Sequence, residues 1–248
     1  MTIDTLMFDL DGTLVDQFHP GSSPQFALLL MRRFRGLTAP AVTLRAALGA
    51  TRLMKRHTSD RTNFEVVITE FARRTGIPYD EVAKRFLAFS QHDFPAMKWR
   101  FRPIPGAREA ILLGKELGFR MVLATNPAVP LSMIQHRVNW AGLGDISWDV
   151  ITHQQIMRRL KPSVDYYRHL LELVDRPAEQ CLMVGNDYQM DTPAMSLGIK
   201  TFLVDRPMNR KQGRVRSVTM PDWLGTYADL ATLIRQLGQE LATAPQSV

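Results

Sequence analysis

Hydrophobic positions follow two different patterns along this chain. Between residues 17 and 102, apolar side chains recur at the spacing of one helix face, most clearly at Phe64, Val67, Ile68 and Phe71. These four predict a helix over 60–76, ending at Gly76 before Pro78. A second helix is predicted at about 80–92, and weaker versions of the pattern predict helices at about 24–34 and 42–56. We find no strand signal between Val15 and Arg102, so this stretch is predicted to be helical throughout.

The rest of the chain alternates short apolar runs with helical segments. The expected strands are 3–9, 119–124, 150–152, 181–184 and 200–204, and the expected helices are 106–118, 131–141, 164–174, 190–197 and 226–237. This alternation is typical of a doubly wound α/β fold with a parallel, Rossmann-like sheet. We expect residues 1–16 and 103–238 to form this core, 17–102 to form a helical insertion, and 239–248 to be a flexible tail.

The composition indicates the class of protein and its expected cellular location. Hydrophobic residues make up 45% of the 248 positions and charged residues 22%, as in ordinary globular proteins. The longest apolar runs, such as 26–31, are far shorter than the roughly 20 residues that cross a bilayer. The N-terminus lacks a signal-peptide pattern, and the single cysteine, Cys181, excludes an internal disulfide. We therefore expect a cytoplasmic protein without a membrane partner.

The net charge of +7 is concentrated in the insertion. Residues 17–102 contain 15 basic and 6 acidic side chains. Because they are scattered among helical positions, most are interpreted as solvated faces, and nucleic-acid binding is not expected. The alternative is that the insertion overhangs a site for anions. Arg52, Lys55 and Arg56 are then its best candidates for touching a substrate.

Carboxylates follow two of the predicted strands. Asp9 and Asp11 come directly after the first strand, and Asp187 and Asp191 follow the strand at 181–184. Ligands of α/β sheets bind beyond the carboxyl ends of the strands, where these side chains would meet. Carboxylates at such a site suit a hard cation that takes oxygen ligands. The pattern predicts a Mg²⁺ site.

Two other strand ends supply groups that suit an anion. Thr125 and Asn126 follow the strand at 119–124, and both can donate hydrogen bonds. Lys161, directly before Pro162, offers a compact cation for a phosphate or a developing oxyanion. With the aspartates, these groups are what phosphoryl transfer through an aspartyl-phosphate needs.

Four segments together resemble the signatures of the haloacid dehalogenase-like (HAD) hydrolase superfamily. They are Asp-Leu-Asp-Gly-Thr-Leu-Val-Asp at 9–16, Thr-Asn at 125–126, Lys-Pro at 161–162 and Gly-Asn-Asp-x-x-x-Asp at 185–191, in the family's order. The insertion lies where C1-type members carry a helical cap. Only 36 residues separate Thr125 from Lys161, too few for the alternative cap at that place.

The resemblance implies a role for each residue. Asp9 would attack phosphorus, and Asp11 would protonate the leaving alcohol and then activate water. Asp9, the Asp11 carbonyl and Asp187 would hold Mg²⁺, with Asp191 completing or orienting the metal shell. Thr125, Asn126 and Lys161 would bind the phosphoryl group.

One position departs from the commonest family pattern. Asn186 stands after Gly185, where many members have an acidic residue. Either Asp187 is the direct metal ligand or Asn186 binds through its amide oxygen. We favour Asp187, because a carboxylate binds Mg²⁺ more strongly than a neutral amide.

The resemblance implies a Mg²⁺-dependent phosphatase of small phosphorylated metabolites. A phosphomutase with the same core residues, or a catalytically silent binding protein with this fold, are the alternatives. A dehalogenase needs neither a metal nor a second carboxylate, so Asp11 counts against it.

Overall fold

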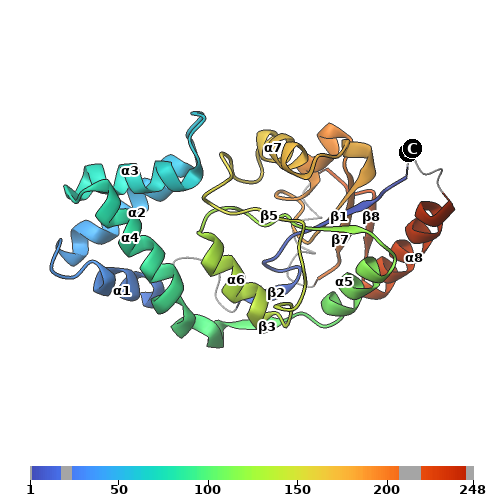
Figure 1. Ribbon diagram of the computed structural model, residues 1–248, viewed down its shortest axis with the longest axis horizontal. Helices are drawn as coiled ribbons and strands as arrows, with labels where there is room; N and C mark the ends of the chain where they lie inside the picture. Colours follow the sequence, from blue (N-terminus) through green and yellow to red (C-terminus); the bar gives the residue numbers. More distant parts are fainter. Residues whose placement is uncertain (1, 18–23, 207–218, 244–248) are drawn as a thin grey trace.

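The computed structural model describes residues 2–17, 24–206 and 219–243. Its core is a parallel six-stranded sheet in the order β5-β4-β1-β6-β7-β8 (Figure 1). The chain adds strands on one side of β1 and then on the other, and this reversal creates a crevice at the carboxyl ends of the central strands. The strands are β1 (Thr5–Phe8), β4 (Arg120–Leu123), β5 (Val150–Ile151), β6 (Cys181–Gly185), β7 (Lys200–Val204) and β8 (Trp223–Gly225).

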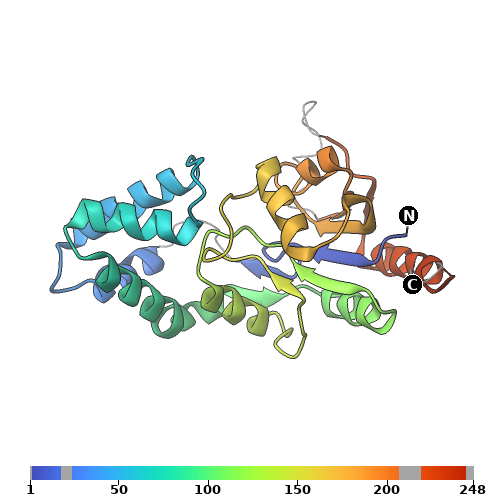
Figure 2. The same cartoon turned by 45° about the horizontal axis from the view of Figure 1, so that its top comes forward.

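Helices cover both faces of the sheet, as a doubly wound fold requires (Figure 2). Successive residues of β1 point to opposite faces, and all four are buried. Leu6 and Phe8 join the core formed with α5 (Ala107–Glu116) and α8 (Tyr227–Thr243). Met7 packs in a second core with α7 (Val164–Val174). The predicted α/β fold is confirmed.

The helical insertion is also confirmed, and it lies to one side of the sheet (Figure 1). It has an aromatic core of its own, in which the rings of Phe34 and Phe71 lie 4.7 Å apart. Among the helices that the structure describes, none is long and apolar enough to cross a membrane. The insertion contains α1 (Pro24–Arg33), α2 (Pro40–Met54), α3 (Asn63–Thr75), α4 (Tyr79–Ala88), a π-helical turn (Phe89–Asp93) and a 3-10 helix (Phe94–Arg100).

Three short elements differ from the sequence predictions. β2 (Val15–Gln17) pairs antiparallel with β3 (Phe101–Pro103) where the chain leaves and re-enters the core. Each has three residues, too few for alternation to be recognised, and the same holds for β8. The expected tail is wrong over 239–243, because α8 continues to Thr243 with Leu241 packed on the core. Residues 244–248 lie outside the described residues.

The N-terminus of α3 is closed by a capping box. Thr62 Oγ1 accepts the backbone N–H of Glu65 at 3.2 Å, and Glu65 Oε2 accepts that of Thr62 at 2.7 Å. We expect Thr62→Ala to lower the free energy of unfolding by about 1 kcal/mol, measured by urea denaturation. Thr232→Ala is the control, because that exposed hydroxyl bonds only within α8. Equal losses in both variants would contradict the capping role.

Candidate active site

A buried lysine connects two of the predicted aspartates. Asp9 follows β1, Lys161 precedes α7, and Asp191 lies beyond β6. Lys161 Nζ donates to Asp9 Oδ1 at 3.0 Å and to Asp191 Oδ1 at 2.7 Å. The side chains of Lys161 and Asp191 are each 1% exposed, and that of Asp9 is 11% exposed. The structure thus brings three predicted residues from distant parts of the chain into one buried ion-pair network.

Burial governs the protonation of this network. It raises the pKa of Asp9 to about 7 against the lowering effect of Lys161, and the carboxylates of Asp191 and Asp11 add to the rise. Burial alone would lower the pKa of Lys161, but Asp191 and Asp9 outweigh it and hold that pKa well above its usual value. The lysine therefore stays charged. The neighbouring carboxylates of Asp191 and Asp11 would favour the binding of a further cation at Asp9.

Asp191 is held rigidly by the turn that follows β6. Its Oδ2 accepts the backbone N–H groups of Asn186 and Asp187, each at 3.0 Å. A Cβ at Gly185 would lie only 2.1 Å from that oxygen, so only glycine leaves room for the carboxylate. Both oxygens of Asp191 are engaged within the protein, and its visible role is to hold Lys161.

The structure places Asn186 and Asp187 in different hydrogen-bonding environments. Asn186 Oδ1 accepts the hydroxyl of Thr13 at 3.0 Å, and that hydroxyl lies 3.4 Å from Asp9 Oδ2. Asp187 instead uses its Oδ1 to accept the backbone N–H groups of Gln189 and Met190. Carboxylates readily form such local turns, and this one fixes the Asp187 side chain beside its own backbone. Asn186 is therefore the residue that lies beside Asp9.

Asp11 forms an ion pair that the sequence analysis missed. Its Oδ2 accepts Nη1 of Arg137, which comes from α6 (Leu131–Trp140). The side chain of Arg137 is 9% exposed, and that of Asp11 is 39% exposed. The sequence did carry a signal for this residue, since Arg137 shares the buried face of α6 with Ile134 and Val138. An arginine on an otherwise apolar helix face needs a buried partner.

Several polar atoms at this edge of the sheet have no protein partner. Asp11 Oδ1 follows β1, and Thr125 Oγ1 and Asn126 Oδ1 follow the neighbouring β4. Each of these atoms is buried and lacks a hydrogen bond within the described residues. Buried polar atoms normally form hydrogen bonds. Because these three unbonded atoms gather at the carboxyl ends of adjacent strands, they indicate a binding place for a polar ligand.

The oxygens present fit a hard cation with few protein ligands. Within the described parts of the chain, no three His, Cys, Asp or Glu side chains gather closely enough to hold a metal ion. The four predicted aspartates thus do not form one cluster, because Asp11, Asp187 and Asp191 have other partners. Asp9 and the amide oxygen of Asn186 do lie together, and Mg²⁺ is commonly held by only one or two carboxylates plus waters.

The insertion reaches the core through the segment after α2. The backbone N–H of Asn63 donates to Met157 O at 2.8 Å, and that of Phe64 donates to Gln154 O at 2.9 Å. The Asn63 amide also reaches Pro127 O at 3.3 Å, next to Asn126. The candidate substrate residues Arg52, Lys55 and Arg56 are exposed and form no ion pair with a described residue. Their contact with a substrate stays a prediction.

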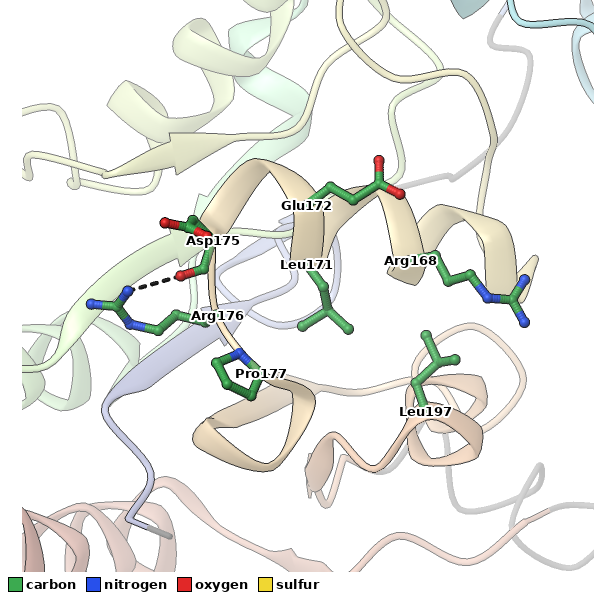
Figure 3. Close-up of a pocket in the computed structure, with 7 residues that line it drawn as sticks. All are labelled: Arg168, Leu171, Glu172, Asp175, Arg176, Pro177 and Leu197. Carbon is green, nitrogen blue, oxygen red and sulfur yellow. Dashed lines mark hydrogen bonds between the residues drawn. The ribbon is translucent and has the colours of Figure 1, made fainter.

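A surface pocket elsewhere on the core is separate from this site (Figure 3). It has a volume of about 520 Å³ and lies between α7 and the 3-10 helix Thr192–Leu197. Asp175 and Arg176 line it just beyond the C-terminus of α7, whereas Lys161 lies before the N-terminus. The pocket is lined by Arg168, Leu171, Glu172, Asp175, Arg176, Pro177 and Leu197.

Comparison with known proteins identifies the family. The sequence matches the model of haloacid dehalogenase-like hydrolases over residues 3–197, and the chain therefore belongs to this family. No curated protein matches the sequence.

Solved structures of the same fold carry different activities. A predicted phosphoglycolate phosphatase from Haemophilus somnus 129PT is 16% identical with a TM-score of 0.54, covering 93% of this chain and 97% of that one. The L-2-haloacid dehalogenase from Xanthobacter autotrophicus is 18% identical with a TM-score of 0.54, covering 94% and 98%. CbbY from Rhodobacter sphaeroides, in complex with phosphate, is 20% identical with a TM-score of 0.53, covering 92% and 96%.

The close approach of Asn186 to the turn after β1 depends on Gly12. This glycine has φ of +85°, and a Cβ there would lie 2.4 Å from Asn186 Nδ2. We expect Gly12→Ala to displace Asn186 and to lower hydrolase activity by about 100-fold. Gly118→Ala is the matched control, since Gly118 has the same φ and nothing within 4 Å of its Cβ.

Both variants should lose about 1–2 kcal/mol of stability from the left-handed backbone alone. Urea denaturation measures this shared loss of stability. An activity assay at saturating substrate measures the effect of displacing Asn186, which is expected only in Gly12→Ala. A fully active Gly12→Ala protein would contradict the role given to this contact.

Proposed function

We propose that this protein is a Mg²⁺-dependent phosphatase of small phosphorylated metabolites that works through an aspartyl-phosphate on Asp9. The observation that carries the proposal is the second carboxylate, Asp11, beside the buried pair of Asp9 and Lys161. Asp11 keeps one buried oxygen that has no hydrogen-bond partner among the described residues, as expected of a group that exchanges a proton with a ligand.

The similar folds include a dehalogenase as well as a phosphatase, so fold similarity does not separate the two reactions. The side chains favour the phosphatase. Displacing a halide needs a nucleophile and water, but no group to protonate a leaving alcohol. Asp11 supplies such a group. Thr125 adds a buried hydroxyl that no described residue bonds, and this hydroxyl is suited to a phosphoryl oxygen.

The proposed reaction has two steps. An oxygen of Asp9 attacks phosphorus, the bond from phosphorus to the ester oxygen breaks, and Asp11 gives its proton to the departing alcohol. Asp11 then takes a proton from water, whose oxygen attacks the phosphoryl group and regenerates the Asp9 carboxylate as inorganic phosphate leaves. Lys161 and Thr125 bind phosphoryl oxygens throughout, and Lys161 keeps Asp9 oriented.

The metal site in this proposal is formed by Asp9, the backbone carbonyl of Asp11 and the amide oxygen of Asn186. When bound, Mg²⁺ would neutralise charge on the phosphoryl oxygens and on Asp9. Asp191 contributes indirectly, by holding Lys161 at 2.7 Å. Asn186 is held against Asp9 through Thr13, so its oxygen needs little rearrangement to serve as a ligand.

Residues 17–102 are proposed to act as a C1-type cap on the core of 1–16 and 103–238. The hydrogen bonds from Asn63 and Phe64 to the core support this proposal, because they join the insertion to the catalytic core. Excluding water would protect the aspartyl-phosphate from uncontrolled hydrolysis and strengthen the electrostatic interactions inside. The surplus of basic residues would attract anionic substrates over longer range. Neither a nucleic-acid nor a membrane partner forms part of this proposal, and a cytoplasmic location fits it.

The reaction class is tested by phosphate release from p-nitrophenyl phosphate and a panel of phosphorylated metabolites. We expect turnover with Mg²⁺, none with EDTA, and a loss of at least about 1,000-fold in Asp9→Asn and Asp11→Asn. Asp165→Asn is the control, since Asp165 is an exposed residue whose ion pair with Arg168 lies on the surface of α7.

Other outcomes identify the alternatives. Halide release from a 2-haloacid without metal would identify a dehalogenase. Phosphoryl transfer within a sugar phosphate, without release of phosphate, would identify a mutase. A folded protein inactive on all of these substrates would support a binding role.

The identity of the metal-binding side chain after β6 is tested with Asn186→Ala and Asp187→Ala. We expect the first to raise the Mg²⁺ concentration for half-maximal activity by about tenfold or more, and the second to leave it within about twofold. Calorimetric titration with Mg²⁺ measures the same difference without substrate. A larger increase in the Mg²⁺ requirement for Asp187→Ala than for Asn186→Ala would identify Asp187 as the direct ligand.

A further inference from the structure

A second buried cation lies beside the candidate active site. Arg137 is 7% exposed, and its guanidinium is held in place by two contacts. Nη1 donates to Asp11, and Nε donates to Met133 O in its own helix at 3.3 Å. The remaining nitrogen, Nη2, is buried and has no hydrogen bond within the described residues. A charged donor left unpaired in such a position is costly unless a ligand completes it.

The two buried cations have different charge environments. Lys161 lies between two carboxylates, Asp9 and Asp191, which together exceed its own charge. The only ion pair of Arg137 in the described structure is with Asp11, whose side chain is 39% exposed. Arg137 can therefore accept further negative charge with less repulsion than Lys161 meets.

The position of Arg137 also assigns it to one end of the substrate. In the proposed reaction, Asp9 contacts phosphorus, and Asp11 contacts the oxygen that leaves with the alcohol. Arg137 bonds to Asp11, whereas Lys161 bonds to Asp9. Arg137 is thus linked, through Asp11, to the leaving-group side of the proposed reaction, and Lys161, through Asp9, to the phosphoryl side.

Resting on the proposed phosphatase function, we propose that Arg137 is a specificity-determining residue that selects phosphomonoesters whose leaving group carries its own anionic group. Nη2 donates to that carboxylate or second phosphate, while Nη1 keeps Asp11 turned toward the ester oxygen. A guanidinium is suited to this double contact, because its rigid fork presents several donors in one plane. A lysine carries the same charge but lacks the planar set of donors.

The test compares two small substrates that differ in one group. 2-Phosphoglycolate has a carboxylate where 2-hydroxyethyl phosphate has a neutral hydroxymethyl group, and ethylene glycol bisphosphate tests a second phosphate. We expect the wild-type protein to prefer the carboxylate or the bisphosphate over the neutral ester by about 10–100-fold in kcat/KM. Whichever anionic substrate is preferred identifies the group that Nη2 binds.

Variants of Arg137 then test whether this residue sets the preference for charged substrates. Arg137→Gln removes the charge. We expect it to bring the ratio of kcat/KM for the charged and the neutral substrate close to one, mainly by raising KM for the charged substrate. Arg137→Lys is expected to restore part of the preference. Arg168→Gln is the matched control, because Arg168 is an exposed arginine with a surface ion pair, and its preference should equal that of the wild type.

The preference ratio separates specificity from the positioning of Asp11. If Arg137 serves only to hold Asp11, its variants lower kcat on charged and neutral substrates equally, and the ratio stays at its wild-type value. That result, or a wild-type protein without a preference for charged substrates, would overturn the proposal while leaving the phosphatase function standing. Failure of the phosphatase function itself would show as no turnover of any ester. Should Arg137→Gln fail to fold, the wild-type ratio and Arg137→Lys still decide.

Discussion

The ion pairs of Lys161 with Asp9 and Asp191 are the interaction on which the rest of the site depends. They join the end of β1, the segment before α7 and the turn after β6, three places that are far apart in sequence. Removing one partner from a buried ion pair leaves an uncompensated charge, at a cost of about 3–5 kcal/mol. The same network therefore positions Asp9, the proposed nucleophile, and fixes how the central segments of the core meet.

A second ion pair, between Asp11 and Arg137, lies closer to solvent, and the proposed reaction gives the two carboxylates different tasks. The inner network is nearly closed to water, which suits the nucleophilic role proposed for Asp9. Asp11 is partly exposed and can trade a proton with an alcohol or with water. Two aspartates only two residues apart thus have different surroundings, and the proposed reaction assigns them different roles on that basis.

Much of the fold could be predicted, since long apolar runs and helical spacing survive in the sequence as local patterns. β1 and the position of Asp9 follow from such a run, whereas β2 and β3 have three residues each and gain their stability from pairing with each other. Asn186 and Asp187 could not be ranked by charge alone, because the hydrogen bonds of Asp187 to the backbone of Gln189 and Met190 exist only once the turn has formed. Arg137 was detectable as a charge on an apolar helix face, but its partner Asp11 is distant in sequence.

In the proposed phosphatase, selectivity has to come from groups outside the phosphoryl site, because the roles proposed for Asp9, Lys161 and Thr125 address only what all phosphomonoesters share. The exposed basic residues of the insertion create a long-range field that salt screens within about 10 Å, so they favour anions in general. A buried donor such as Arg137 acts in a less polar environment, where one unpaired hydrogen bond is enough to distinguish related substrates. The Asn63 amide bonds to Pro127 O, next to Asn126, so the insertion meets the core close to a proposed phosphate-binding residue. In this proposal the core selects substrates at short range through Arg137, and the insertion attracts anions at long range.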